Sequence, residues 1–292
     1  ENLNKEASLI REFKFKDEDS TSKLYRRNNG KIVFLFNGDT HRALNAAALA
    51  AVRGFDFGLT ETERNSVNEF VGTARLYGKT FPNLEITRGE VDLRGVHSKL
   101  ETAYGQLNAQ HGADSPTAPK LKNVFGGLYT EPSDNLGDIS VNPFPALETV
   151  SDGLQLNSYS ASKETILFPE LVFVGGNLNT DLSVAFSKLA TIRGNFYAAS
   201  PYESEESQRV SFLSPVTVDG NFTVEHSAVS GTIEIKGNAS VRDHSSLDGK
   251  VLVQGDLTLG EYGAADGVTF VGDNLFAAMN SRADNVLSVG NT

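Results

Sequence analysis

The sequence predicts a mainly-β protein: a right-handed, parallel β-helix-like solenoid over residues 81–292, preceded by a small α/β cap over residues 1–80. Three observations predict this fold. A short β-type run, a Gly with a polar neighbour and a second β-type run recur along the chain. Apolar residues alternate with period two inside these copies, as in strands with one buried face. Toward the C-terminus the copies recur every 18 residues.

The repeat occurs about ten times. Its copies begin at Leu84, Leu100, Leu121, Leu147, Leu171, Leu189, Val216, Ile233, Val251 and Thr269. The 18-residue period is clearest in two series: Gly231, Gly249 and Gly267, and Ala239, Leu257 and Leu275. Stacked coils of this kind place like residues about 4.8 Å apart, one coil above the next.

Two structural expectations follow from this register. Six residues should face inward in stacked columns: Leu84, Leu147, Leu171, Leu189, Val251 and Val253. Segments rich in Ser, Pro, Asp and Glu, at 109–120, 131–143 and 199–213, should leave the solenoid as loops. A β-sandwich built from hairpins is the alternative fold.

The first 80 residues have a different pattern. Residues 7–15 and 31–36 read as strands, and a helix is expected from Asp39 or Thr40 to about Gly54. Thr60 and Glu63 have capping-box spacing for a second helix through about Leu76. Its apolar face would contain Val67, Phe70, Val71 and Ala74. We interpret this region as a cap over the open end of the solenoid, with an independent α+β domain as the alternative.

Composition excludes several classes of function. The chain has 26 basic and 37 acidic residues, a net charge of −11, which disfavours binding to nucleic acid. It has no Cys, so thiol catalysis, disulfides and Cys-based zinc sites are excluded. No apolar run approaches the roughly 18 residues of a transmembrane segment. Because the sequence starts at Glu1, we expect that a leader has been removed and that the protein is exported.

Polar residues that repeat at one coil position are interpreted as structural. None of the five His lies in a nucleophile elbow or a zinc-binding motif. His226, His244 and Tyr262 are 18 residues apart and should stack in an outer column, flanked by Glu225 and Asp243. Asn195, Asn221, Asn238 and Asp256 share one corner after Gly, which favours turn structure over an active site. The sequence therefore predicts no catalytic residue, no metal site and no cofactor, and it does not identify the ligand-binding residues.

Three copies share an aromatic-proline start: FPNLEITRG from Phe81, FPALETVSDGLQL from Phe144 and FPELVFVGGNL from Phe168. Phe186 to Leu189 form a related start. These segments resemble the repeats of receptor L domains, the leucine-rich-repeat-like β-helical domains of growth-factor receptors, with relatives among fungal cell-wall proteins and Bacteroides-type surface lipoproteins. The resemblance covers about residues 81–200, and the lack of Cys makes the bacterial envelope relatives the better match. From about residue 214 the chain is more similar to a plain β-helix, such as the polymerising bactofilins.

The resemblance implies extracellular recognition or adhesion and supplies no catalytic residues. We therefore expect a non-catalytic protein of the extracellular space or outer cell surface, with a lipid anchor before processing as one option. Its partner would be an unidentified extracellular glycan, protein or cell-wall ligand, bound along one face of the solenoid. Two alternatives remain open: a polysaccharide-active β-helix enzyme and a structural β-helix that assembles end to end.

Overall fold

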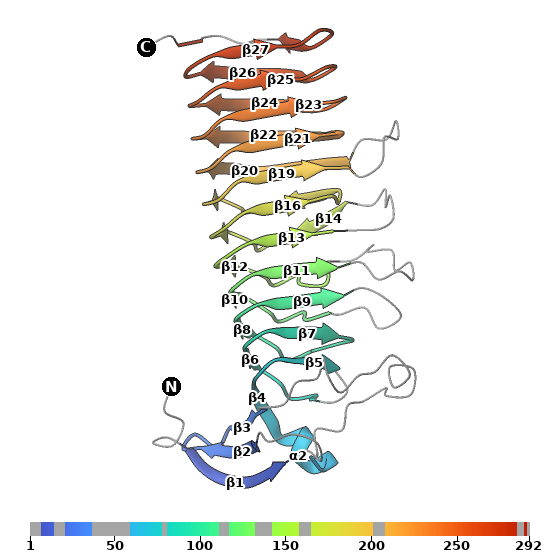
Figure 1. Cartoon of the computed structure of the whole chain (residues 1–292), viewed down its shortest axis with the longest axis vertical. Helices are drawn as coiled ribbons and strands as arrows, with labels where there is room; N and C mark the ends of the chain where they lie inside the picture. Colours follow the sequence, from blue (N-terminus) through green and yellow to red (C-terminus); the bar gives the residue numbers. More distant parts are fainter. Residues whose placement is uncertain are drawn as a thin grey trace.

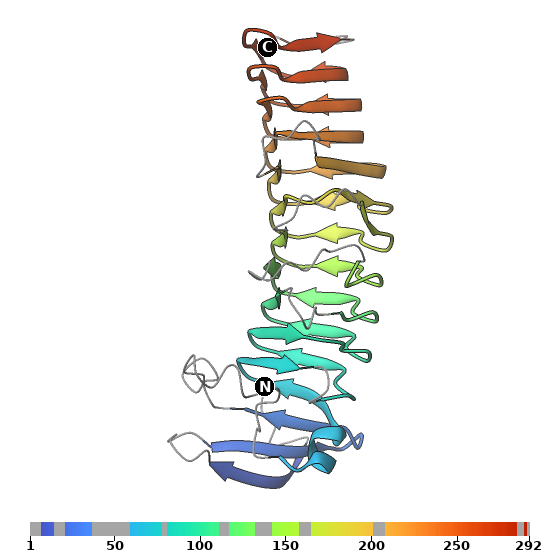
Figure 2. The same ribbon diagram turned by 90° about the vertical axis from the view of Figure 1, so that its right-hand side faces the viewer.

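The chain folds into a β-solenoid of about ten turns, an elongated column in which the coils stack from the N-terminal to the C-terminal end (Figures 1 and 2). The computed structural model describes residues 7–14, 21–36, 59–77, 81–110, 117–131, 142–157, 165–200, 208–284 and 289–290. Within these residues, strands pair into a 17-stranded and an 11-stranded sheet. Every pairing from β3 onward is parallel, which rules out the hairpin sandwich.

The 11-stranded sheet takes one short strand from each coil. Its strands are β5 (Ala74–Tyr77), β7 (Val91–Arg94), β9 (Leu107–Gln110), β11 (Leu128–Glu131), β13 (Leu154–Leu156), β16 (Leu178–Thr180), β19 (Phe196–Ala199), β21 (Phe222–Glu225), β23 (Ala239–Arg242), β25 (Leu257–Leu259) and β27 (Leu275–Ala277). In the view of Figure 1 these strands form the front of the column.

The 17-stranded sheet forms the remaining walls. Its first wall contains β4 (Val67–Val71), β6 (Ile86–Arg88), β8 (Thr102–Tyr104), β10 (Asn123–Phe125), β12 (Thr149–Val150), β15 (Phe173–Val174) and β18 (Thr191–Ile192). A second wall starts with β14 (Ile166–Phe168) and β17 (Val184–Phe186). Longer strands then run through both walls: β20 (Gln208–Val218), β22 (Ser227–Ile235), β24 (Ser246–Val253) and β26 (Ala264–Val271). The short β28 (Arg282–Asp284) follows them.

The core is a set of apolar columns running along the solenoid axis. All six residues expected to face inward are buried, each with at most 1% of its surface exposed: Leu84, Leu147, Leu171, Leu189, Val251 and Val253. Aromatic rings stack in the same way, and the centroids of Phe196 and Phe222 lie 4.6 Å apart. The period-two pattern is therefore confirmed as the signal of one buried face per strand.

Glycine is required where one coil crosses closely over the next. Gly231, Gly249 and Gly267 all have positive φ, between +89° and +144°. A Cβ on Gly249 would overlap the carbonyl oxygen of Gly231, and one on Gly267 would overlap that of Gly249. This column explains the 18-residue recurrence of Gly, because only glycine tolerates both the conformation and the close approach.

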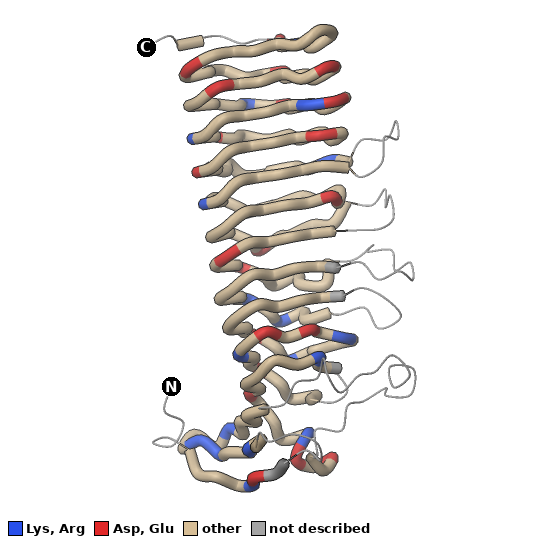
Figure 3. Tube along the Cα trace, in the orientation of Figure 1, with Lys and Arg blue, Asp and Glu red and all other residues tan. Residues whose placement is uncertain are grey.

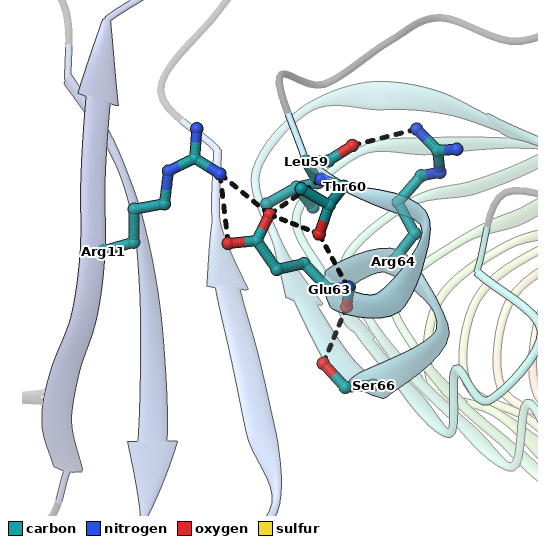
Figure 4. A network of polar contacts seen from close by, with 6 residues as sticks. All are labelled: Arg11, Leu59, Thr60, Glu63, Arg64 and Ser66. Atoms are coloured by element: carbon teal, nitrogen blue, oxygen red, sulfur yellow. Dashed lines mark hydrogen bonds and ion pairs between the residues drawn. The ribbon is translucent and has the colours of Figure 1, made fainter.

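The N-terminal region confirms the predicted capping box and the start of its helix but not the predicted length of that helix. The Glu63 N–H donates to Thr60 Oγ1 at 3.2 Å, and the Thr60 N–H donates to Glu63 Oε2 at 2.7 Å (Figure 4). Arg11 Nη1 donates to both carboxylate oxygens of Glu63, at 3.0 and 2.8 Å. The helix α2 (Glu61–Ser66) ends at Ser66. The expected continuation through Leu76 is wrong.

The residues after α2 are strand-forming and pair in the ladder. Val67, Phe70 and Val71 belong to β4, which lies between β3 (Ile32–Leu35) and β6, and Ala74 begins β5. Val67, Phe70 and Ala74 are buried by neighbouring coils and Val71 is half-buried, rather than lying along one face of a helix. The strand is favoured because β-branched and aromatic residues fit a pleated surface well. The parallel ladder thus continues across residue 80, where the cap was expected to end. The division of the chain into a cap over 1–80 and a solenoid over 81–292 stays a prediction.

The remaining N-terminal strands form an antiparallel edge to the ladder. They are β1 (Ala7–Lys14) and β2 (Thr21–Arg27), and β2 pairs in turn with β3. The expected helix at 39–54 lies outside the described residues, as do residues 111–116, 132–141 and 201–207 of the expected loops. The loop expected at 199–213 is wrong at its C-terminal end, because residues 208–213 belong to β20 and pair in the parallel ladder. None of the helices that the structure describes is long and apolar enough to cross a membrane.

Candidate functional site

The outer face of the 11-stranded sheet carries a column of uncharged side chains, which we call the neutral column. Its members, one on each strand from β11 to β25, are Tyr129, Gln155, Asn179, Tyr197, Thr223, Ser240 and Thr258. Each stands between two inward-facing neighbours; Leu178 and Thr180, which flank Asn179, are both buried. Figure 3 shows no charged residue in the middle of these strands. Six intervals of about 4.8 Å make the column roughly 29 Å long.

A second column, the amide ladder, lies at the start of the same strands. It consists of Asn177, Asn195, Asn221, Asn238, Asp256 and Asn274. From Asn195 onward, each backbone N–H donates to the Oδ1 of the member on the preceding coil, at distances between 2.8 and 3.0 Å. This geometry supports the interpretation of the repeated Asn and Asp as turn structure. The ladder uses the Oδ1 of the first four members, so the Nδ2 amino groups of Asn177, Asn195, Asn221 and Asn238 remain as a row of donors beside the neutral column. Asn274 instead donates its Nδ2 to Asp256 Oδ1 at 2.9 Å.

Below Tyr129 the neutral column gives way to a charged network. Asn108 Nδ2 donates to Asp92 Oδ1 at 2.9 Å and accepts, through Oδ1, a hydrogen bond from Gln106 Nε2 at 2.9 Å. Asp92 also lies 3.6 Å from Arg75 Nε. Asp92 and Asn108 are buried, so this network is packed against its neighbours and is less accessible than the column above it.

At the opposite end of the strands the predicted ring column is present. The rings of His244 and Tyr262 stack with centroids 4.6 Å apart and an interplanar angle of 7°, and those of His226 and His244 are 6.5 Å apart. All three residues adopt positive φ, between +47° and +55°. The column is therefore produced by a left-handed corner that recurs in successive coils. Glu225 and Asp243 lie beside His226, with side-chain donor atoms of all three residues within 4.8 Å of one another.

Tyr197 connects the neutral column to this corner. Its hydroxyl donates to Glu225 Oε2 at 3.0 Å, although 39% of the Tyr197 surface is exposed. The pKa of the Tyr197 phenol is raised, most strongly by its partial burial and then by the hydrogen bond to Glu225 and the negative charge of that carboxylate. The phenol therefore stays protonated near neutral pH, with an exposed ring whose orientation is held by a carboxylate.

A smaller aromatic cluster occupies the first wall of the 17-stranded sheet. Tyr104 and Phe125 stack with centroids 4.9 Å apart, and the Arg88 guanidinium lies 4.2 Å from the centre of the Tyr104 ring. Arg88 also pairs with Glu69 at 2.6 Å. Unlike the neutral column, this cluster covers only neighbouring coils and is bordered by charge.

No protein-family model, curated protein or solved structure matches this chain.

Sequence reasoning found the ring column but not the neutral column. The 18-residue period was enough to place His226, His244 and Tyr262 together. Tyr129, Gln155 and Asn179 lie at spacings made irregular by loops between the coils, so their common column appears only when the strands are paired. In every copy the column member directly follows the first buried residue of the second β-type run, as Asn179 follows Leu178. Aligning the copies at that position would have revealed the neutral column.

Proposed function

We propose that this protein is a non-catalytic recognition or adhesion protein that binds an extended, uncharged glycan along the neutral column. The observation that carries the proposal is the column itself: seven outward-facing, uncharged positions in register over roughly 29 Å. A repeating surface of this length matches a repeating polymer better than a compact small molecule, for which a concave pocket is usual.

The chemistry of the side chains favours sugar. Amide and hydroxyl groups, as in Gln155, Asn179 and Thr223, both donate and accept hydrogen bonds, as sugar hydroxyls do. The ring of Tyr197 offers a flat apolar surface with a polar end, which suits the C–H face of a sugar ring and an adjacent hydroxyl. The chain carries a net charge of −11, yet the column holds none of it, which favours a neutral ligand over an acidic one.

Export and a place at the outer cell surface belong to the same proposal. The aromatic-proline starts at Phe81, Phe144 and Phe168 support it through their resemblance to receptor L domains and their bacterial surface relatives. A parallel solenoid that exposes one long, regular face is also well suited to adhesion, because several weak contacts along one polymer add up to useful affinity.

The test is a glycan array followed by calorimetric titration with matched variants. Asn179→Ala removes an amide from the neutral column, and Asn123→Ala removes the same group from the outer face of the other sheet. We expect binding to a neutral polysaccharide that Tyr197→Ala weakens by about tenfold or more, as for a hot-spot aromatic. Asn179→Ala should weaken it as well, and Asn123→Ala should not.

Two results would overturn the proposal. The first is the absence of binding to any neutral glycan on a broad array. The second is equal loss in Asn179→Ala and Asn123→Ala, which would place binding elsewhere. Turnover of the bound glycan would instead support the enzymatic alternative.

A further inference from the structure

The corner beside His226 changes length between two coils. Glu225 on β21 pairs with Arg242 on β23, and the Ser227 N–H donates to Ser245 Oγ. On the first coil a single residue, His226, separates Glu225 from Ser227. On the next coil two residues, Asp243 and His244, separate Arg242 from Ser245. Asp243 is thus an inserted residue, and it adopts φ +38°. The insertion brings a second carboxylate next to Glu225 and His226.

The three side chains offer a mixed ligand set. One ring nitrogen of His226 and one oxygen each of Glu225 and Asp243 lie within 4.8 Å of one another. Ligands that share a tetrahedral Zn²⁺ at bonds of about 2.0–2.2 Å lie roughly 3.4 Å apart, so small side-chain rotations would close the set. Imidazole nitrogen with carboxylate oxygen is a donor combination that zinc uses, and three protein ligands with an open position is a frequent arrangement.

The backbone already holds these groups in place. The His226 N–H donates to the Asp243 carbonyl oxygen at 3.1 Å, and Ser227 Oγ donates to the Glu225 carbonyl oxygen at 2.9 Å. The Tyr197 hydroxyl hydrogen-bonds Glu225 Oε2, as outer-shell groups do for metal-bound carboxylates. Arg242, which pairs with Glu225 across the β21–β23 ladder, directs its Nε to Ser240 Oγ at 3.0 Å.

We propose that Glu225, His226 and Asp243 form a binding site for one divalent transition-metal ion of the Zn²⁺ class, with a coordination position left open to water or ligand. The three proposed ligands lie outside the neutral column and the proposal does not rest on the glycan function, although Tyr197 borders both sites. His244 is not part of the site, because its ring is stacked on Tyr262 in the next coil.

The experiment is calorimetric titration of the tag-free protein with Zn²⁺ at about pH 7.5, because metal affinity depends on pH and must be compared at one value. Asp243→Asn and His226→Asn remove ligands, and Asn tolerates the left-handed backbone at both positions. His244→Asn is the matched control at the adjacent left-handed position. We expect one Zn²⁺ per chain, at least tenfold weaker binding in both ligand variants, and unchanged binding in the control.

Tyr197→Phe tests the hydrogen bond to Glu225. It should weaken Zn²⁺ binding by about tenfold and alter the visible absorption spectrum of the Co²⁺-loaded protein, while the thermal unfolding midpoint of the metal-free protein is unchanged. The proposal is overturned if the parent protein binds no Zn²⁺. It is also overturned if both ligand variants bind like the parent, or if His244→Asn loses binding to the same extent.

Discussion

His97 should make the solenoid sensitive to mild acid. It is 2% exposed, and its Nε2 lies 3.2 Å from the Leu76 carbonyl oxygen and 3.1 Å from that of Arg94. The Nδ1 atom is buried without a hydrogen-bond partner among the described residues. Protonation would place a charge and an unpaired N–H in the core. Burial accordingly lowers the pKa of His97 from 6.5 to about 4, outweighing the two carbonyl contacts that raise it.

The sign of the effect follows from this depressed pKa. Above about pH 6.5 His97 is neutral in both states and the full stability is present; as pH falls toward 4, the unfolded chain binds the proton first. The whole shift corresponds to about 3 kcal/mol of unfolding free energy, of which about 2 kcal/mol is lost by pH 5. Because carboxylates also titrate in this range, the contribution of His97 must be measured as a difference.

The assay is urea unfolding of the parent protein and of His97→Gln between about pH 7.5 and pH 5. The parent should lose about 2 kcal/mol more than the variant over this range, even if the variant is less stable at neutral pH. Parallel pH profiles for the two proteins would refute the reasoning, because they would show that His97 titrates alike in the folded and unfolded chains.

Two further predictions concern the coils themselves. Gly249→Ala should lower the unfolding free energy by several kcal/mol, because its Cβ would overlap the preceding coil at φ +111°. Gly30→Ala, at φ +83° with open space around it, should cost only the backbone strain of about 1 kcal/mol. Thermal unfolding compares the two variants, and equal losses of stability would contradict the close-approach argument. Leu171→Ala should cost about 2–5 kcal/mol through lost burial and the resulting cavity, and a loss below about 1 kcal/mol in urea unfolding would show that its column tolerates a void.

The sequence predicted the solenoid because its signal is periodic. Glycine at a fixed corner and Leu or Val at alternating positions reflect local requirements that every coil repeats, so Leu84 and Val251 could be placed inside without any structure. The helix expected through Leu76 failed for the opposite reason. A capping box determines where a helix starts, but whether Val67 to Val71 continue it depends on β3 and β6, which lie far away in sequence.

The candidate sites were harder to predict because they arise between coils. The neutral column depends on strand register across loops of unequal length, and the group around His226 depends on a single inserted residue, Asp243. Neither produces a contiguous motif. The stacking of His226, His244 and Tyr262 was predictable only because no loop interrupts the 18-residue period there.

The most direct test of the proposed function is the dependence of affinity on ligand length. A neutral glycan identified on the array should be titrated as a series of oligosaccharides of increasing length. If the ligand lies along the neutral column, affinity should rise with each added sugar until the chain spans roughly 29 Å and should then level off. Asn179→Ala should reduce the gain from added length. Full affinity for a mono- or disaccharide would contradict binding along the column.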